Sequence, residues 1–166
     1  MAAHSAGIML YRMTASGLEV LLGHMGGPFW ARKQEHAWSI PKGEAAAGEP
    51  DLEVALREFA EELGVPAPEL RYLDVGTYRY SSGKTVAVFT AEAPDFELAA
   101  LHSNTFDMEW PPRSGRVQSF PEFDEARWVS LGEARSLLVA GQLPAVDALL
   151  RQLGIEPKDA PRNVSD

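Results

Sequence analysis

The sequence contains no cysteine, and this absence excludes several kinds of site at once. Without thiols the chain forms no disulfide, zinc–thiolate site, iron–sulfur cluster or cysteine nucleophile. It also lacks an apolar run of about 18 residues, the length that a membrane-spanning helix requires. Its first residues show no cationic start followed by an apolar stretch, so we expect no signal peptide, no membrane partner and a cytoplasmic location.

Positive charge is scarce in this chain. Lys and Arg number 15 against 24 Asp and Glu, which gives a formal net charge of −9. Proteins that bind nucleic acids without sequence preference normally present a basic surface, so we expect no nucleic-acid partner other than an RNA 5′ end. Hydrophobic residues make up 45% of the 166 residues, which is enough for a globular core.

A single domain is expected over residues 1–155, followed by a flexible tail over 156–166. Strands and helices alternate without a regular βαβ repeat, which favours a mixed sheet flanked by helices. Residues 104–123 are expected to form a long connection that closes over a base, packs locally or joins two copies, so monomer and homodimer both stay open. The pattern predicts strands over 5–12, 18–24, 38–40, 70–80, 84–93 and 126–130, and helices over 50–63, 131–140 and 144–153.

The predicted helix over 50–63 carries an acidic cluster that folding alone does not explain. Glu58, Glu61 and Glu62 fall together on the side opposite the apolar stripe. Like charges at these spacings repel by about 0.2–0.5 kcal/mol per pair, and the macrodipole disfavours anions in this half of the helix. A divalent cation such as Mg²⁺ would offset both penalties, and the alternative is a solvated acidic face. The predicted core stripe consists of Leu52, Ala55, Leu56, Phe59 and Leu63.

The residues around this cluster form a longer pattern. Gly43 is followed after five residues by Glu49, and after seven more by Arg57-Glu58-Phe59-Ala60-Glu61-Glu62-Leu63-Gly64-Val65. This stretch resembles the Nudix box at all nine of its fixed positions. The resemblance implies an α/β/α sandwich with a central mixed β-sheet. It also implies Mg²⁺-dependent hydrolysis of a phosphoanhydride bond in a nucleoside diphosphate linked to another group, with Mn²⁺ as a substitute cation.

The same resemblance implies roles for the residues of the box. Glu58, Glu61 and Glu62 resemble the ligands of the Mg²⁺ ion, together with the backbone carbonyl of Gly43. Arg57 resembles a catalytic residue that forms a supporting ion pair with the first glutamate of the box. A carboxylate must accept a proton from the attacking water, and Glu58 and Glu61 both stay candidates for this task.

Three further segments resemble the asymmetric diadenosine tetraphosphate hydrolases of this superfamily. They are Trp38-Ser39-Ile40-Pro41-Lys42-Gly43, Lys84-Thr85-Val86, and Glu122 at six residues before Trp128. The likeness implies that Glu122 adds a carboxylate to the metal site, and the alternative is a surface glutamate. The residues that the likeness implies to bind substrate are His36, Lys42, Tyr78, Tyr80 and Lys84. The alternative for the two tyrosines is that they are ordinary strand residues. The alternative for the two lysines and the histidine is that they are surface side chains.

Three functional hypotheses remain open from the sequence. The first is a hydrolase for a small-molecule nucleotide, above all a dinucleoside polyphosphate such as diadenosine tetraphosphate. The second is a clean-up pyrophosphohydrolase for oxidised nucleoside triphosphates or RNA 5′ ends. The third, from another class, is a catalytically dead nucleotide-binding regulator, and the intact set of box glutamates argues against it.

Overall fold

The computed structural model describes residues 3–156. The predicted tail begins at Glu156, and the rest of that tail lies outside the described residues. Among the helices in this range, none combines the length and the apolar character needed to cross a membrane.

A mixed sheet occupies the centre of the fold. Its strand order is β3-β2-β1-β6-β5, with β4 paired to β1 and β9 paired to β2. The β1 and β6 strands run parallel and the other pairs of this sheet run antiparallel, so the predicted mixed sheet is confirmed. The strands are β1 (His4–Thr14), β2 (Gly17–Met25), β3 (Trp38–Ser39), β4 (Lys42–Glu44), β5 (Leu73–Arg79), β6 (Thr85–Glu92) and β9 (Phe123–Ser130).

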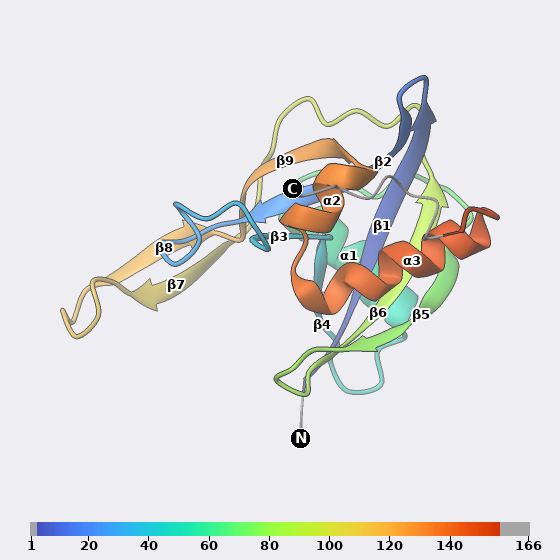
Figure 1. The fold of residues 1–166 in the computed structure, drawn as a ribbon. Helices are drawn as coiled ribbons and strands as arrows, with labels where there is room; N and C mark the ends of the chain where they lie inside the picture. Colours follow the sequence, from blue (N-terminus) through green and yellow to red (C-terminus); the bar gives the residue numbers. More distant parts are fainter. Residues whose placement is uncertain (1–2, 157–166) are drawn as a thin grey trace.

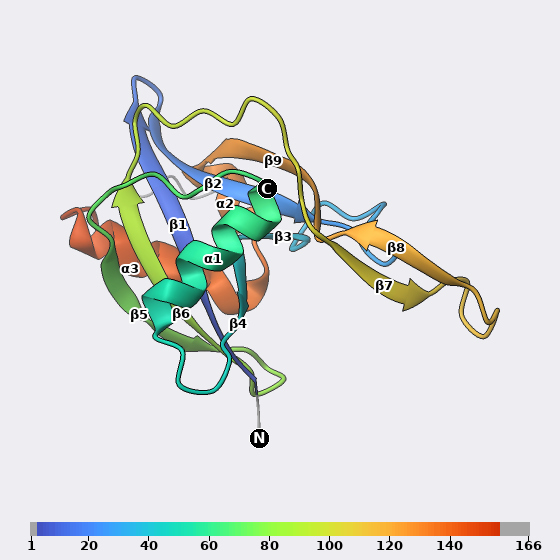
Figure 2. The same cartoon turned by 180° about the vertical axis from the view of Figure 1, so that it is seen from behind.

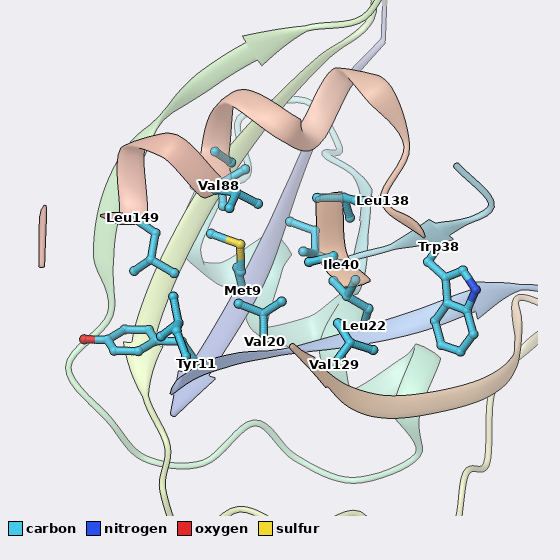
Figure 3. Packing of buried hydrophobic residues seen from close by; sticks show 14 of the residues in the cluster. Met9, Tyr11, Val20, Leu22, Trp38, Ile40, Val88, Val129, Leu138 and Leu149 are labelled. Carbon is cyan, nitrogen blue, oxygen red and sulfur yellow. The ribbon is translucent and has the colours of Figure 1, made fainter. Parts of the chain in front are cut away.

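Helices cover both faces of this sheet, which confirms the α/β/α sandwich. Helix α1 (Asp51–Leu63) packs on one face, and α2 (Leu131–Leu137), the short η1 (Ala140–Gln142) and α3 (Leu143–Gln152) lie on the other (Figures 1 and 2). Strand β1 serves both cores because its side chains alternate. Ile8 and Leu10 pack in the cluster beneath α1. Met9 and Tyr11 pack toward α3 with Val88 and Leu149 (Figure 3).

Helix α1 follows the sequence prediction closely in its bounds, and two features of its burial differ. It begins after Pro50 and ends at Gly64, whose positive φ of 80° provides the left-handed C-cap. Val54, Ala55, Phe59 and Leu63 are buried beneath it, whereas the predicted core residues Leu52 and Leu56 are only partly buried. The alternative that Glu62 belongs to a solvated acidic face is wrong. Glu62 is only 7% exposed, because β4 packs beside the helix. The Lys42 backbone N–H of that strand donates to the Glu62 carboxylate over 3.0 Å.

The region predicted as a long connection is instead a β-hairpin. Strands β7 (Thr105–Glu109) and β8 (Val117–Pro121) pair antiparallel and project away from the body of the domain in both views (Figures 1 and 2). We call residues 105–121 the arm. The arm packs against the loop after β2 along its length: Phe106, near its base, covers Gly27, and the Trp110 ring at the outer end of β7 meets the Phe29 ring edge to face at 5.5 Å. Local packing of this segment is therefore present, and its closing over a base and its joining of two copies stay predictions.

Candidate active site

One cavity of about 1030 Å³ collects most of the residues that the sequence singled out. Its wall comes from β4, the outer side of α1, the turn after β5, the segment before α3, and the base of the arm. Residues far apart in the chain thus meet at one place, where the helix of the box passes the end of β4. The sequence-predicted residues that line it are His36, Lys42, Gly43, Glu58, Glu61, Glu62, Tyr80, Lys84 and Glu122.

Burial perturbs three carboxylates in this wall. It raises the pKa of Glu62 to about 8, repulsion from Glu58 and Glu122 adds to this, and the charge and backbone N–H of Lys42 act against it. Burial, followed by repulsion from Glu61, raises the pKa of Glu58. Burial also raises the pKa of Glu122, and Lys42 opposes it. Each carboxylate is therefore costly to ionise here without added positive charge.

A chain of backbone hydrogen bonds brings Glu122 to the helix. The Asn104 N–H donates to the Glu61 carbonyl over 2.8 Å, and the Glu122 N–H donates to the Asn104 carbonyl over 2.9 Å. The first bond satisfies one of the carbonyls that the end of a helix leaves without an internal partner. The carboxylate predicted from a distant part of the sequence thus reaches the cavity through the segment that leads into the arm.

Gly43 forms a cradle for Glu58. A Cβ atom at Gly43 would lie 1.9 Å from the carboxyl carbon of Glu58 and 2.2 Å from its nearer oxygen. No side chain fits at this position without displacing the carboxylate. An alanine here would therefore push the Glu58 carboxylate, the end of a flexible side chain, out of its present place.

Arg57 organises the mouth of the site without lining the cavity. Its Nε and Nη2 donate to the two carboxylate oxygens of Glu49 over 3.1 and 3.0 Å, so the predicted ion pair is present and is bidentate. This contact lowers the pKa of Glu49. Its Nη1 lies 2.9 Å from Glu58 and 3.4 Å from Glu61. Arg57 thus holds the loop before α1 and two glutamates of the helix together.

The carboxylates suit a divalent metal ion by their chemistry, although they do not form a closed cluster. Among residues 3–156, no three acidic or histidine side chains converge tightly enough to make a preformed metal cage. Arg57 draws Glu58 and Glu61 to one side, and the Lys42 backbone engages Glu62. Carboxylate oxygens and a nearby backbone carbonyl are the hard donors that Mg²⁺ prefers.

Positively charged and polar groups that the sequence reasoning missed share the same cavity. Arg79 lines it beside Tyr80, and Asn104 and Trp30 line it from the arm base and the loop after β2. Arg79 lies in the sequence between Tyr78 and Tyr80, which were both predicted to bind substrate. This position is the one local feature of the sequence that could have indicated a role for Arg79. Trp30 and Asn104 carry no motif. The backbone hydrogen bond to the Glu61 carbonyl holds Asn104 at the site, and the fold of the loop after β2 brings Trp30 there.

Tyr78 is the predicted substrate contact that the structure does not bring to the cavity. Its hydroxyl donates to the Val75 carbonyl of its own strand, and its ring packs against the core beneath α3. The register of β5 shifts between Asp74 and Thr77, which allows this local contact. Burial raises the pKa of the Tyr78 hydroxyl. The alternative of an ordinary strand residue fits this geometry.

Comparisons with known proteins agree with this architecture. A family model described as NUDIX domain matches residues 2–149. The asymmetrical bis(5′-nucleosyl)-tetraphosphatase of Sus scrofa is 29% identical over 116 residues, which are 67% of this chain and 67% of that protein. The RNA pyrophosphohydrolase of Cronobacter sakazakii is 31% identical over 120 residues, which are 67% of this chain and 65% of that protein.

A solved structure with the same fold extends the comparison to nearly the whole chain. The crystal structure of a C. elegans Ap4A hydrolase binary complex superposes with a TM-score of 0.66 and 20% identity, over 92% of this chain and 98% of that one. At this identity the likeness concerns the fold. Since the family model covers most of the residues, the chain belongs to the NUDIX domain family.

Proposed function

We propose that this Nudix hydrolase cleaves a phosphoanhydride bond in a nucleoside diphosphate linked to another group, with a dinucleoside polyphosphate such as diadenosine tetraphosphate as the first candidate. The observation that carries the proposal is one cavity lined by five glutamates together with Lys42, Arg79 and Lys84. The glutamates supply oxygen ligands for a cation, and the three positive side chains can bind phosphate oxygens away from it. A polyphosphate is the ligand class that would use both the glutamates, through a bound cation, and the positively charged side chains.

The residues that would hold the cation are those that the sequence indicated. Nudix hydrolases generally use a divalent metal, and here Glu58, Glu61, Glu62, Glu122 and the Gly43 carbonyl would hold Mg²⁺, with Mn²⁺ as a substitute. When bound, such an ion offsets the negative charge of the phosphates and makes water easier to deprotonate. It would also offset the cost of ionising the buried glutamates.

The general base is one of two glutamates with different surroundings. Glu58 is half-buried and its pKa is raised, so it is a stronger proton acceptor than an ordinary carboxylate. Glu61 is more exposed, and its backbone carbonyl already anchors the arm. This difference supports Glu58 as the base. Arg57 then acts by holding Glu58 in place over 2.9 Å, and Lys42 and Lys84 orient the phosphate chain.

The arm favours an RNA 5′ end as the second candidate substrate. Arg113 and Arg116 are exposed at its tip, and neither forms an ion pair within the described part of the chain. Arg32 and Phe29 are exposed on the loop that packs against the arm. Cations interleaved with aromatic rings are typical of surfaces that bind single-stranded nucleic acid. This surface leads away from the cavity, where a longer substrate would extend.

A substrate panel separates these possibilities. The protein is incubated with Mg²⁺ and, in separate reactions, diadenosine tetraphosphate, nucleoside triphosphates, a nucleoside diphosphate sugar and a short RNA with a 5′ triphosphate, and the products are resolved by chromatography. The first candidate predicts the highest kcat/KM on the tetraphosphate, with ATP and AMP as products. An RNA substrate predicts a rate that falls in an Arg113→Ser/Arg116→Ser variant and not in Arg71→Ser, an exposed cation outside the cavity. Tight nucleotide binding without any turnover would favour the regulator.

A further inference from the structure

Gln142 is a buried amide behind the cavity wall, and every hydrogen of its side-chain NH₂ group is used. The residue is fully buried. Its Nε2 donates to the Ser39 hydroxyl and to the Tyr80 hydroxyl, over 2.9 Å in each case. Its Oε1 accepts the Ile40 N–H over 3.0 Å. Since a backbone N–H can only donate, one orientation of the amide satisfies all three partners.

These three bonds join two parts of the cavity that are distant in sequence. Ser39 and Ile40 lead directly into Lys42 and Gly43, the segment that cradles Glu58. Tyr80 follows β5 and lines the cavity beside Lys84. Gln142 is the last residue of η1. Its side chain links the segment that leads to Gly43, beside the glutamates, to the turn after β5 that carries Tyr80 and Lys84. No polar side-chain atom buried within residues 3–156 lacks a partner, so the link is complete.

The Tyr80 side chain is fixed from two sides. Gly141 lies against its ring, and a Cβ at that glycine would stand 1.8 Å from Cδ1. The Tyr80 hydroxyl accepts the Gln142 N–H, and its own proton meets no acceptor in the part of the chain that the structure describes. A tyrosine hydroxyl both donates and accepts, so this proton stays available to a further acceptor, and Tyr80 is among the residues that line the cavity.

We propose that Gln142 is a positioning residue, which together with Gly141 holds the Tyr80 ring and directs its hydroxyl proton toward an acceptor on the substrate. This inference rests on the proposed function, because Tyr80 then recognises the nucleotide substrate of that reaction. Tyr80 lies on the phosphate side of the cavity and contributes to binding. The arrangement therefore sets substrate affinity and leaves the hydrolytic step to the glutamates.

Three substitutions test this arrangement by different physical routes. Gln142→Met keeps the size of the side chain and removes the amide. Tyr80→Phe keeps the ring and removes the hydroxyl. Gly141→Ala keeps both hydrogen-bonding groups and forces the ring away. Gly132→Ala is the matched control, because an added Cβ there meets nothing within 4 Å. The measurements are kcat and KM on the best substrate of the panel, with the melting temperature as the check on folding.

We expect Gln142→Met and Gly141→Ala each to raise KM by about tenfold with kcat within about twofold, which corresponds to about 1.4 kcal/mol of binding free energy. Tyr80→Phe should raise KM in the same direction. Because the amide acts through the hydroxyl, the double variant should bind no more weakly than Gln142→Met alone. The control should match the wild type.

The opposite pattern would overturn the inference. An unchanged KM in both Tyr80→Phe and Gly141→Ala would remove Tyr80 from substrate recognition, whether or not Gln142→Met folds. Strictly additive effects of Gln142→Met and Tyr80→Phe would show that the amide acts elsewhere. Failure of the proposed function looks different, because the wild type itself would then hydrolyse no nucleotide of the panel.

Discussion

The stability of the protein should depend on the protonation of Glu62. Its carboxylate is buried beside β4, and burial raises its pKa from 4.5 to about 8. The folded state therefore holds a proton on Glu62 between these two values, whereas the unfolded chain has released it. This contribution to the free energy of unfolding is complete below pH 4.5 and is lost as the pH rises to about 8.

The magnitude follows from the size of the shift. Each pKa unit corresponds to about 1.36 kcal/mol, so the wild type should lose about 2–5 kcal/mol of stability from this group across the window. Glu62→Gln removes the ionisation and keeps an oxygen that can accept the Lys42 N–H. The variant should therefore be more stable than the wild type at about pH 9 and should lose that advantage near pH 4.5.

The assay is urea unfolding in chelator at several pH values, followed by the same series with Mg²⁺. Glu53→Gln, an exposed glutamate of the same helix that does not line the cavity, is the control. With Mg²⁺ the ionised Glu62 gains a partner, so the wild type should recover stability at high pH and Glu62→Gln should not. Parallel stability curves for the wild type and Glu62→Gln would refute the reasoning.

Other substitutions separate the roles of the cavity residues. Glu122→Gln should lower kcat by about 10²-fold with less effect on KM, measured at saturating Mg²⁺, and an unchanged kcat would leave the box glutamates as the whole carboxylate set. Lys84→Ala should reduce kcat/KM more for a four-phosphate substrate than for a nucleoside diphosphate sugar, and equal losses would contradict a role in binding the phosphate chain. Gly43→Ala should abolish turnover, since the added carbon would stand 1.9 Å from the Glu58 carboxyl carbon; full activity would mean that this cradle is not needed.

The helix and its glutamates could be predicted because their signals are local. Spacing along one helix places Glu58 and Glu61 together, and a left-handed C-cap needs a residue such as Gly64. The burial of Glu62 could not be predicted in this way. It depends on how β4 crosses the helix, and the strand contributes only three residues and a backbone N–H donor to that contact.

The hairpin of the arm and the hydrogen bond from Gln142 to Tyr80 could not be predicted from local sequence patterns. The arm strands are five residues each and bury little, so their alternation is weak in a sequence that also contains Pro111 and Pro112. Gln142 has no motif, and a lone glutamine predicts an exposed side chain. Its burial becomes visible only when Ser39, Ile40 and Tyr80 are brought around it by the sheet and η1.

The most direct test of the central claim is the rate of diadenosine tetraphosphate cleavage as Mg²⁺ is titrated, for the wild type and for Glu61→Gln. The account predicts no turnover in chelator, a saturable rise with Mg²⁺, and ATP and AMP as products. In Glu61→Gln the rise should be lost while the melting temperature stays at or above that of the wild type, because a repulsive charge has been removed. Turnover that is independent of the cation, or equal in the two proteins, would contradict the assignment of this cavity as the hydrolytic site.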